Sequence, residues 1–132
     1  MTSRNALLFN TVVSWNEIPM ITIRPGVRRQ VYSTDDVMVA RHELEAGMTL
    51  RPHTHANFDQ LVYIAEGTCH YYVGGTPHRM AAGMFLLVPR GSEHYVEPIG
   101  GLCVNIDIFV PPRADMMPPL PAGQVRPAGS AG

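Results

Sequence analysis

Lysine is absent from this sequence of 132 residues, and so are long apolar runs. All ten basic residues are arginines, which excludes Schiff-base chemistry on a lysine amine. No stretch approaches the ~20 apolar residues of a membrane helix. The start, MTSRNALLFNTVVSW, lacks the apolar region and the small-residue cleavage site of a signal peptide. We therefore expect a soluble cytoplasmic protein with no membrane partner.

Charge and cysteine are also scarce. Charged residues make up 16% of the chain and the formal net charge is -1, so there is no basic surface for nucleic acid, which we exclude as a partner. The two cysteines, Cys69 and Cys103, have no CxxC spacing and indicate neither a zinc knuckle nor a thiol redox motif. We interpret both as small buried residues. With 45% hydrophobic residues, the chain is large enough for one domain with a core that needs no disulfides.

Short runs of valine, isoleucine, tyrosine and phenylalanine, separated by glycine and proline, dominate the chain, while helical periodicity is almost absent. This pattern is typical of an all-β sandwich or barrel. Gly74 and Gly75 indicate a hairpin, because glycine adopts positive φ at little cost. The expected strands are Leu7–Val13, Ile21–Arg24, Val27–Ser33, Val37–Leu44, Gln60–Ala65, Thr68–Val73, Phe85–Val88, His94–Glu97 and Leu102–Val110.

The composition changes after Val110 to a stretch rich in proline and glycine that has little apolar surface to bury. We therefore expect a barrel over residues 1–113, with an N-terminal strand extension, and a tail over residues 114–132.

Two histidines one residue apart are the strongest chemical signal. In a strand, His53 and His55 would present both imidazoles to one face. Gln60 opens the next expected strand, and His94 follows a turn at Gly91, so each could reach the same point. Three nitrogens and one oxygen suit a divalent transition metal ion and leave coordination positions open. A His-x-His pair is also often structural or exposed, and His42, His70 and His78, which lack partner spacing, are interpreted as ordinary residues.

The last expected strand places Asn105, Asp107 and Phe109 on one face, and the alternate positions of Val104–Val110 on an apolar core face. A carboxylate in an apolar strand is costly unless it faces a polar cavity, so we expect Asp107 to face the metal. The alternative is a structural aspartate bonded to a neighbouring strand. Arg113 follows two prolines that stiffen the chain, which favours a pocket-rim residue that holds a carboxylate. The alternative is a surface arginine at the start of the tail.

Two motif blocks surround the histidines. The first is glycine, five residues, His-x-His, four residues, an oxygen ligand, six residues and glycine, from Gly47 to Gly67. The second is glycine, five residues, Pro-x-Gly, two residues and histidine, from Gly83 to His94. Over roughly residues 27–113 this pattern resembles the cupin superfamily. The resemblance implies a double-stranded β-barrel, of jelly-roll type, with a central metal held by His53, His55, Gln60 and His94.

Two positions depart from the cupin pattern. Gln60 stands where the first block usually has glutamate, and Glu97 stands where the second usually has asparagine. Gln60 keeps the oxygen donor of a glutamate but not its negative charge. The full positive charge of the ion is therefore left for a bound substrate. This favours Lewis-acid chemistry over oxygen activation.

A finer resemblance comes from Trp15, the stretch GVRRQVY, glutamine as the oxygen ligand and the terminal DIFVPPR. Together they look like the KdgF-type cupins, which convert 4,5-unsaturated monouronates to their open-chain keto form. The resemblance implies functional roles for Asp107, Phe109 and Arg113. The substrate carboxylate and an adjacent oxygen would occupy the open metal positions, Arg113 would orient the carboxylate, Phe109 would pack against the ring and Asp107 would shuttle a proton.

Two other function classes fit the same features. One is a metal-dependent dioxygenase of a small organic substrate, and the other is a non-catalytic small-molecule binder. The ligand set accepts zinc, nickel, manganese, iron or copper, and the expected partner is a small, carboxylate-bearing substrate. Small cupins commonly pair, and the early strand Leu7–Val13 could add to a partner's sheet, so we expect a homodimer.

Overall fold

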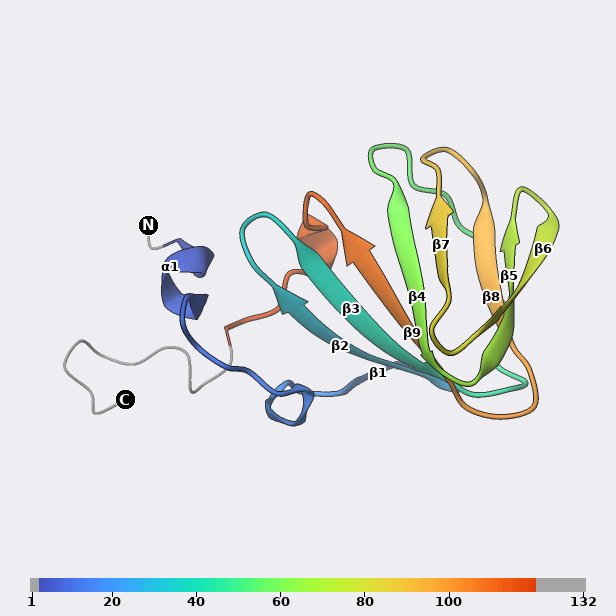
Figure 1. The fold of residues 1–132 in the computed structure, drawn as a ribbon, viewed down its shortest axis with the longest axis horizontal. Coiled ribbons are helices and arrows are strands. Elements are labelled where there is room, and N and C mark those ends of the chain that lie inside the picture. Colours follow the sequence, from blue (N-terminus) through green and yellow to red (C-terminus); the bar gives the residue numbers. More distant parts are fainter. Residues whose placement is uncertain (1–2, 121–132) are drawn as a thin grey trace.

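The strands pair antiparallel in two sheets that face each other (Figure 1). The structure is a computed structural model that describes residues 3–120. One sheet has six strands in the order β1-β2-β3-β9-β4-β7, and the other has three in the order β6-β5-β8. The elements in chain order are α1 (Arg4–Leu8), the 3-10 helix η1 (Trp15–Glu17), β1 (Ile21–Arg24), β2 (Val27–Ser33), β3 (Met38–Leu44), β4 (Gln60–Glu66), β5 (Thr68–Val73), β6 (Thr76–Ala81), β7 (Phe85–Val88), β8 (His94–Pro98), β9 (Cys103–Phe109) and the 3-10 helix η2 (Ala114–Met116).

The core lies between the sheets and confirms the prediction of an all-β barrel. Burial alternates strictly along β3, as expected for a strand with one face inside. Val62 and Ile64 from β4 pack there with Tyr71 from β5. Cys69 and Cys103 are buried and free, as predicted. A second cluster, of Met38, Ala40, Phe109 and Met116, lies toward the end of the barrel where β3 begins and β9 ends.

Glycines make two of the turns that connect strands. Gly74 and Gly75 have φ of 56° and 83° and form the predicted hairpin, here between β5 and β6. Gly67, with φ of 82°, joins β4 to β5, and a Cβ atom there would lie 2.3 Å from the carbonyl oxygen of Leu102. Any side chain at residue 67 would therefore displace the backbone before β9.

The predicted strand Leu7–Val13 is wrong, and with it the N-terminal strand extension. This part of the chain begins with α1 instead, and Phe9 and Val12 beyond it are exposed. The Asp35 carboxylate, from the turn between β2 and β3, accepts hydrogen bonds from the first backbone N–H groups of α1, those of Arg4 and Asn5. These donors need a partner at every helix start. Here the partner is Asp35, a residue about thirty positions away, so no local sequence pattern predicts the helix.

Strand β6 was not predicted. Its residues are mostly exposed, because it forms the edge of the three-stranded sheet and shows no apolar alternation. An edge strand also tolerates Pro77, which lacks a backbone N–H. A strand with one buried face shows alternating apolar residues in the sequence. Strand β6 has almost no buried residues and therefore lacks this pattern.

In strand β9, the prediction of an apolar core face is wrong at Ile106 and Ile108. Asn105, Asp107 and Phe109 are buried toward the barrel interior, whereas Ile106 and Ile108 lie half-buried on the outer face. The predicted apolar core face is thus the outside of the six-stranded sheet. The interior tolerates the polar side chains because they bond to one another.

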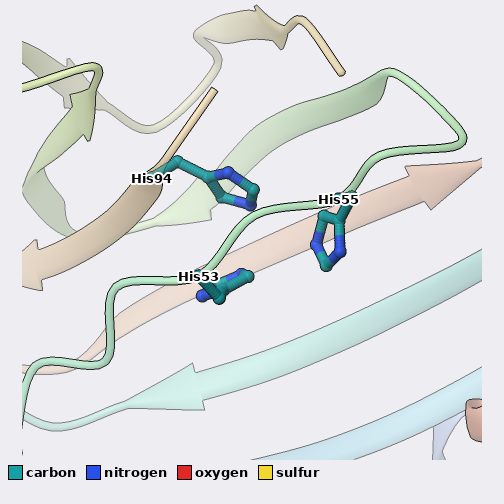
Figure 2. A group of neighbouring side chains, drawn as sticks. All are labelled: His53, His55 and His94. Carbon is teal, nitrogen blue, oxygen red and sulfur yellow. The ribbon is translucent and has the colours of Figure 1, made fainter. Parts of the chain in front are cut away.

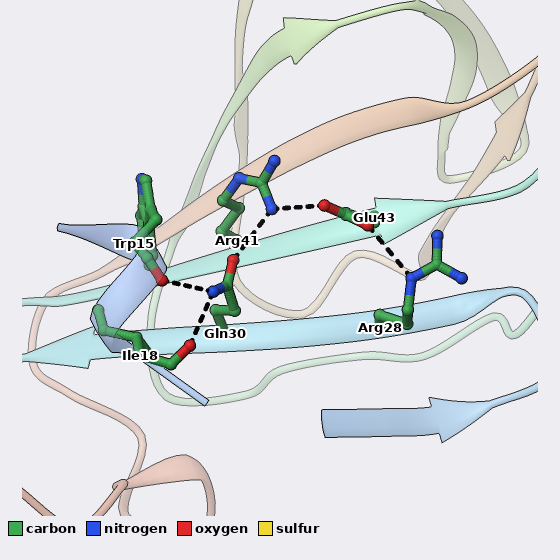
Figure 3. A network of polar contacts seen from close by, with 6 residues as sticks. All are labelled: Trp15, Ile18, Arg28, Gln30, Arg41 and Glu43. Carbon is green, nitrogen blue, oxygen red and sulfur yellow. Dashed lines mark hydrogen bonds and ion pairs between the residues drawn. The ribbon is translucent and has the colours of Figure 1, made fainter. Parts of the chain in front are cut away.

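A polar network fixes the N-terminal segment to the outer face of β2 and β3 (Figure 3). The buried Gln30 side chain donates to the carbonyl oxygens of Trp15 and Ile18, over 2.7 and 2.8 Å. Arg41 donates to the Gln30 amide oxygen and to Glu43, over 3.0 and 2.8 Å. This arrangement satisfies the backbone of η1, so the start of the chain is tied to the sheet without strand pairing.

At the other end, the first residues of the expected tail lie against the barrel. Met116, in η2, is 9% exposed and packs with Met38 and Phe109. The rest of the expected tail, residues 121–132, lies outside the described residues. Within residues 3–120, no helix is both long and apolar enough to span a membrane.

Candidate metal centre

Three histidines converge at one end of the barrel (Figure 2). His53 and His55 lie in the segment between β3 and β4, and His94 begins β8. Two backbone hydrogen bonds, of 3.0 and 2.9 Å, pair His53 with His94, and Gly91 N–H donates to the His55 carbonyl over 2.7 Å. This short antiparallel bridge holds the ring-bearing segments side by side. One ligand atom from each ring lies within 4.8 Å of the others.

The orientation of these rings suits a cation. The Nδ1 atom of His94 lies 2.9 Å from the Ser92 carbonyl and that of His53 lies 2.8 Å from the Arg51 carbonyl. Because a carbonyl only accepts, each Nδ1 carries the hydrogen, and the Nε2 of each neutral ring carries a lone pair. Among the described residues, the buried Nε2 of His55 has no hydrogen-bond partner.

Gln60 brings an oxygen to the same place. Its Oε1 lies 3.1 Å from His94 Nε2, while its Nε2 donates to Asp107 Oδ1 over 2.8 Å and to the Tyr71 hydroxyl over 3.2 Å. The amide oxygen of Gln60 therefore lies beside the His94 Nε2 atom, at the place where the three histidines converge. Three imidazole nitrogens and one amide oxygen form a donor set that a borderline divalent ion accepts.

The protonation state of the histidines also favours a metal. His94 is buried, His55 half-buried and His53 exposed at the mouth. Desolvation lowers the pKa of His55 to about 4, and the positive charge of Arg113 and the neighbouring His53 act in the same direction. His55 is therefore neutral at pH 7, which is the form that binds metals.

Asp107 lies beside Gln60 inside the barrel, in a pocket that His53, Arg29 and Arg113 also line. Burial raises the pKa of this carboxyl, but hydrogen bonding from His42, Gln60 and Asn105 outweighs it, so the pKa is lowered from its usual value. Asp107 is consequently an anion at neutral pH and is set up to accept a proton.

Phe109 and Arg113 line the same pocket. The Arg113 guanidinium carbon lies 5.3 Å from the centroid of the Phe109 ring and 5.8 Å from that of Phe58, within range of a cation–π interaction. Asp115 accepts two hydrogen bonds from the same guanidinium, of 3.2 and 2.8 Å. The pocket has a volume of about 100 Å³.

The sequence interpretation missed two residues of this site. His42 is 8% exposed and its Nδ1 lies 3.3 Å from Asp107 Oδ2, while Arg29 donates from Nε to His42 Nε2 over 2.9 Å. From its sequence context, His42 is interpreted as an ordinary residue. The available signal was its register, because it alternates with Met38, Ala40 and Leu44, all of which face the core. His70, half-buried on β5, and His78, exposed on β6, lie outside the histidine cluster.

This fold and site define the class of protein. The sequence profile of the Cupin domain family matches residues 40–105, which is half of the chain, and the chain belongs to this family. The match spans β3 to the middle of β9 and includes all three histidines.

Among individual proteins, the chain is similar to the pectin degradation protein KdgF of Dickeya dadantii (strain 3937). The two are 27% identical over 103 residues, which are 77% of this chain and 94% of the relative. The structure of KdgF from Halomonas sp. matches with a TM-score of 0.73 at 25% identity, over 80% of this chain and 100% of that chain. An RmlC-like cupin from Shewanella frigidimarina NCIMB 400 matches with a TM-score of 0.72 at 25% identity, over 80% of this chain and 94% of that chain. The protein is therefore a KdgF-like cupin whose three histidines are consistent with a metal site.

Proposed function

We propose that this protein is a metal-dependent enzyme that opens the ring of 4,5-unsaturated monouronates and converts them to their keto form. The observation that carries the proposal is the joint placement of Gln60 and Asp107: a neutral amide oxygen faces the histidines, and an ionised carboxylate borders the same pocket. The similarity to KdgF, a pectin degradation protein, supports this substrate class.

The chemistry follows from the groups that line the pocket. A divalent ion held by His53, His55, His94 and Gln60 would supply a Lewis acid that stabilises negative charge on substrate oxygens. Arg113 would hold the substrate carboxylate, since a guanidinium matches its two oxygens. Phe109 would pack against the sugar ring.

Asp107 would carry the proton. As an anion it accepts the proton of the C1 hydroxyl while the C1–O5 bond breaks and a C1 aldehyde forms. The electron pair of that bond leaves O5 as an enolate. Asp107 then returns the proton to C4, and O5 becomes the C5 ketone. The reaction is an isomerisation that needs no oxidant or reductant, in accord with a neutral oxygen ligand beside the three histidines.

The test is to incubate zinc-loaded protein with 4,5-unsaturated galacturonate and follow the loss of its ultraviolet absorbance, with oxygen uptake recorded in parallel. We expect a rate well above that in buffer and no oxygen uptake. A rate equal to that in buffer would reject the assignment, and metal-dependent oxygen uptake would favour a dioxygenase in its place.

A further inference from the structure

A chain of polar contacts runs along the pocket wall, across β2, β3, β9 and β4 of the six-stranded sheet, to the metal centre. It starts at Arg29 on β2, passes through His42 on β3 and Asp107 on β9, and ends at Gln60 on β4. The three contacts measure 2.9 Å (Arg29 Nε to His42 Nε2), 3.3 Å (His42 Nδ1 to Asp107 Oδ2) and 2.8 Å (Gln60 Nε2 to Asp107 Oδ1). These four strands are neighbours in the sheet, so the chain is fixed by the fold.

Arg29 determines which nitrogen of His42 carries the hydrogen. A guanidinium only donates hydrogen bonds, so His42 Nε2 must accept from it, and the ring is neutral with its hydrogen on Nδ1. That hydrogen faces Asp107 Oδ2. The two atoms are 3.3 Å apart but are not aligned for a hydrogen bond, and within the described part of the chain the buried Nδ1 has no hydrogen-bond partner. His42 therefore places its single N–H group next to the Asp107 carboxylate.

Asp107 in turn determines which end of the Gln60 amide faces the histidines. The carboxylate oxygen Oδ1 accepts from Gln60 Nε2 and from Asn105 Nδ2, over 2.8 and 3.1 Å. Rotating the amide by half a turn would place its oxygen against this carboxylate, which is repulsive. With the observed orientation, the amide oxygen lies 3.1 Å from His94 Nε2.

We propose that Arg29 and His42 are positioning residues of the metal centre: they hold the Asp107 carboxylate where it orients the Gln60 oxygen toward the ion. The inference rests on the metal centre of the proposed function and not on its substrate. An amide needs such a device because only one of its two ends can bind a cation, whereas both oxygens of the usual glutamate can do so.

Three variants of His42 separate positioning from packing. His42→Asn keeps a donor at the place of Nδ1, His42→Gln keeps an acceptor for Arg29 but removes the donor to Asp107, and His42→Leu removes both. His70→Leu, on the other sheet, is the matched control. The readout is the zinc dissociation constant from calorimetry, with the melting temperature recorded for each variant.

We expect His42→Gln and His42→Leu to weaken zinc binding by about 10- to 100-fold, the range usual for partners of metal ligands. His42→Asn should stay within about threefold of the unaltered protein, and His70→Leu should bind like it. Equal zinc affinity in all three His42 variants, with or without a lower melting temperature, would overturn the proposal. If His42→Leu does not fold, the comparison of His42→Gln with His42→Asn decides the matter in the same way.

A double-mutant cycle tests the route through Gln60. In a Gln60→Ala background there is no amide to orient, so His42→Gln should no longer change the zinc dissociation constant. An undiminished effect of His42→Gln in that background would contradict the proposed route. Zinc affinity is measured without any uronate, so a failure of the uronate assay would reject the proposed function and leave this inference standing.

Discussion

At the scale of single residues, Asp107 has two tasks in the proposed mechanism, and its contacts keep them apart. One oxygen, Oδ1, accepts from the amides of Gln60 and Asn105, and the other, Oδ2, faces His42. A buried carboxylate with this many donors is held in one orientation and remains ionised. The same side chain can therefore orient a ligand and accept a proton.

The variant Asp107→Asn tests the second task with little change in shape. The asparagine side chain would retain an oxygen for Gln60 but could not take up a proton, so we expect the turnover number on 4,5-unsaturated galacturonate to fall by about 10²–10⁴-fold. Asp59→Asn, at an exposed carboxylate paired with Arg90, is the control and should turn over normally. An unchanged turnover number in Asp107→Asn would show that another group moves the proton.

The three histidines and Gln60 could be predicted from the sequence because their spacing lies within two short blocks. The burial of His42 could be predicted from its alternation with Met38, Ala40 and Leu44, but its contacts with Arg29 and Asp107 could not, because they join β2, β3 and β9, which are distant in the chain. The register places Arg29 opposite His42, and Asn105 opposite His42 on the other side. Only the folded sheet brings these residues into one line.

At the scale of elements, the predicted strands depend on a local sequence pattern, whereas the missed helix depends on contacts between residues distant in the chain. Strands such as β3, β4 and β5 have a buried face that leaves an apolar pattern in the sequence. Helix α1 has five residues, too few to be stable alone, and depends on Asp35 in the turn between β2 and β3. Its formation is a tertiary effect.

The docking of α1 should depend on the charge of Asp35. Hydrogen bonds from Ser3 and from the backbone N–H of Asn5 lower the pKa of this carboxyl from its ordinary value of 3.8. The stabilisation is fully present above pH 3.8 and is lost as the pH falls through the lower pKa of the folded protein. In hydrogen exchange we expect residues 4–9 to remain protected at about pH 4 and to lose protection below it.

The variant Asp35→Asn should reduce that protection at neutral pH as well, because a neutral amide oxygen is a weaker acceptor for the backbone N–H groups at the start of the helix. Asp59→Asn again serves as the control, since the pKa of Asp59 is also lowered, by hydrogen bonds from Arg90 far from α1. If residues 4–9 exchange equally in both variants, Asp35 does not hold the helix.

At the scale of the whole molecule, the outer face of the six-stranded sheet is apolar over β4, β7 and β9. Leu61 on β4 lies opposite Leu87 on β7 and Ile108 on β9, and Tyr63 lies opposite Phe85 in the adjacent row. Phe85 and Leu87 are each 64% exposed. Contiguous apolar surface of this kind marks an interaction site in a soluble protein, and a surface without charge can pack against a second copy of itself.

The homodimer stays a prediction. Its basis is now this apolar face, because the N-terminal strand that was expected to pair with a partner is absent from the described residues. Light scattering during gel filtration should give twice the chain mass of 14.5 kDa. Leu87→Glu should give the monomer mass, because it would bury a charge at the contact. Val12→Glu, at a residue that is 93% exposed outside the sheet, should remain dimeric. A monomer mass for the unaltered protein would refute the prediction.

The central claim is that one cation is held by the Nε2 atoms of His53, His55 and His94 and by the Oε1 atom of Gln60. A crystal of the zinc-loaded protein, measured with X-rays at the zinc absorption edge, tests it most directly. We predict one anomalous peak in the barrel, about 2.0–2.2 Å from each of these four atoms. An anomalous map with no peak between the three histidines, or with zinc bound elsewhere on the chain, would contradict the account.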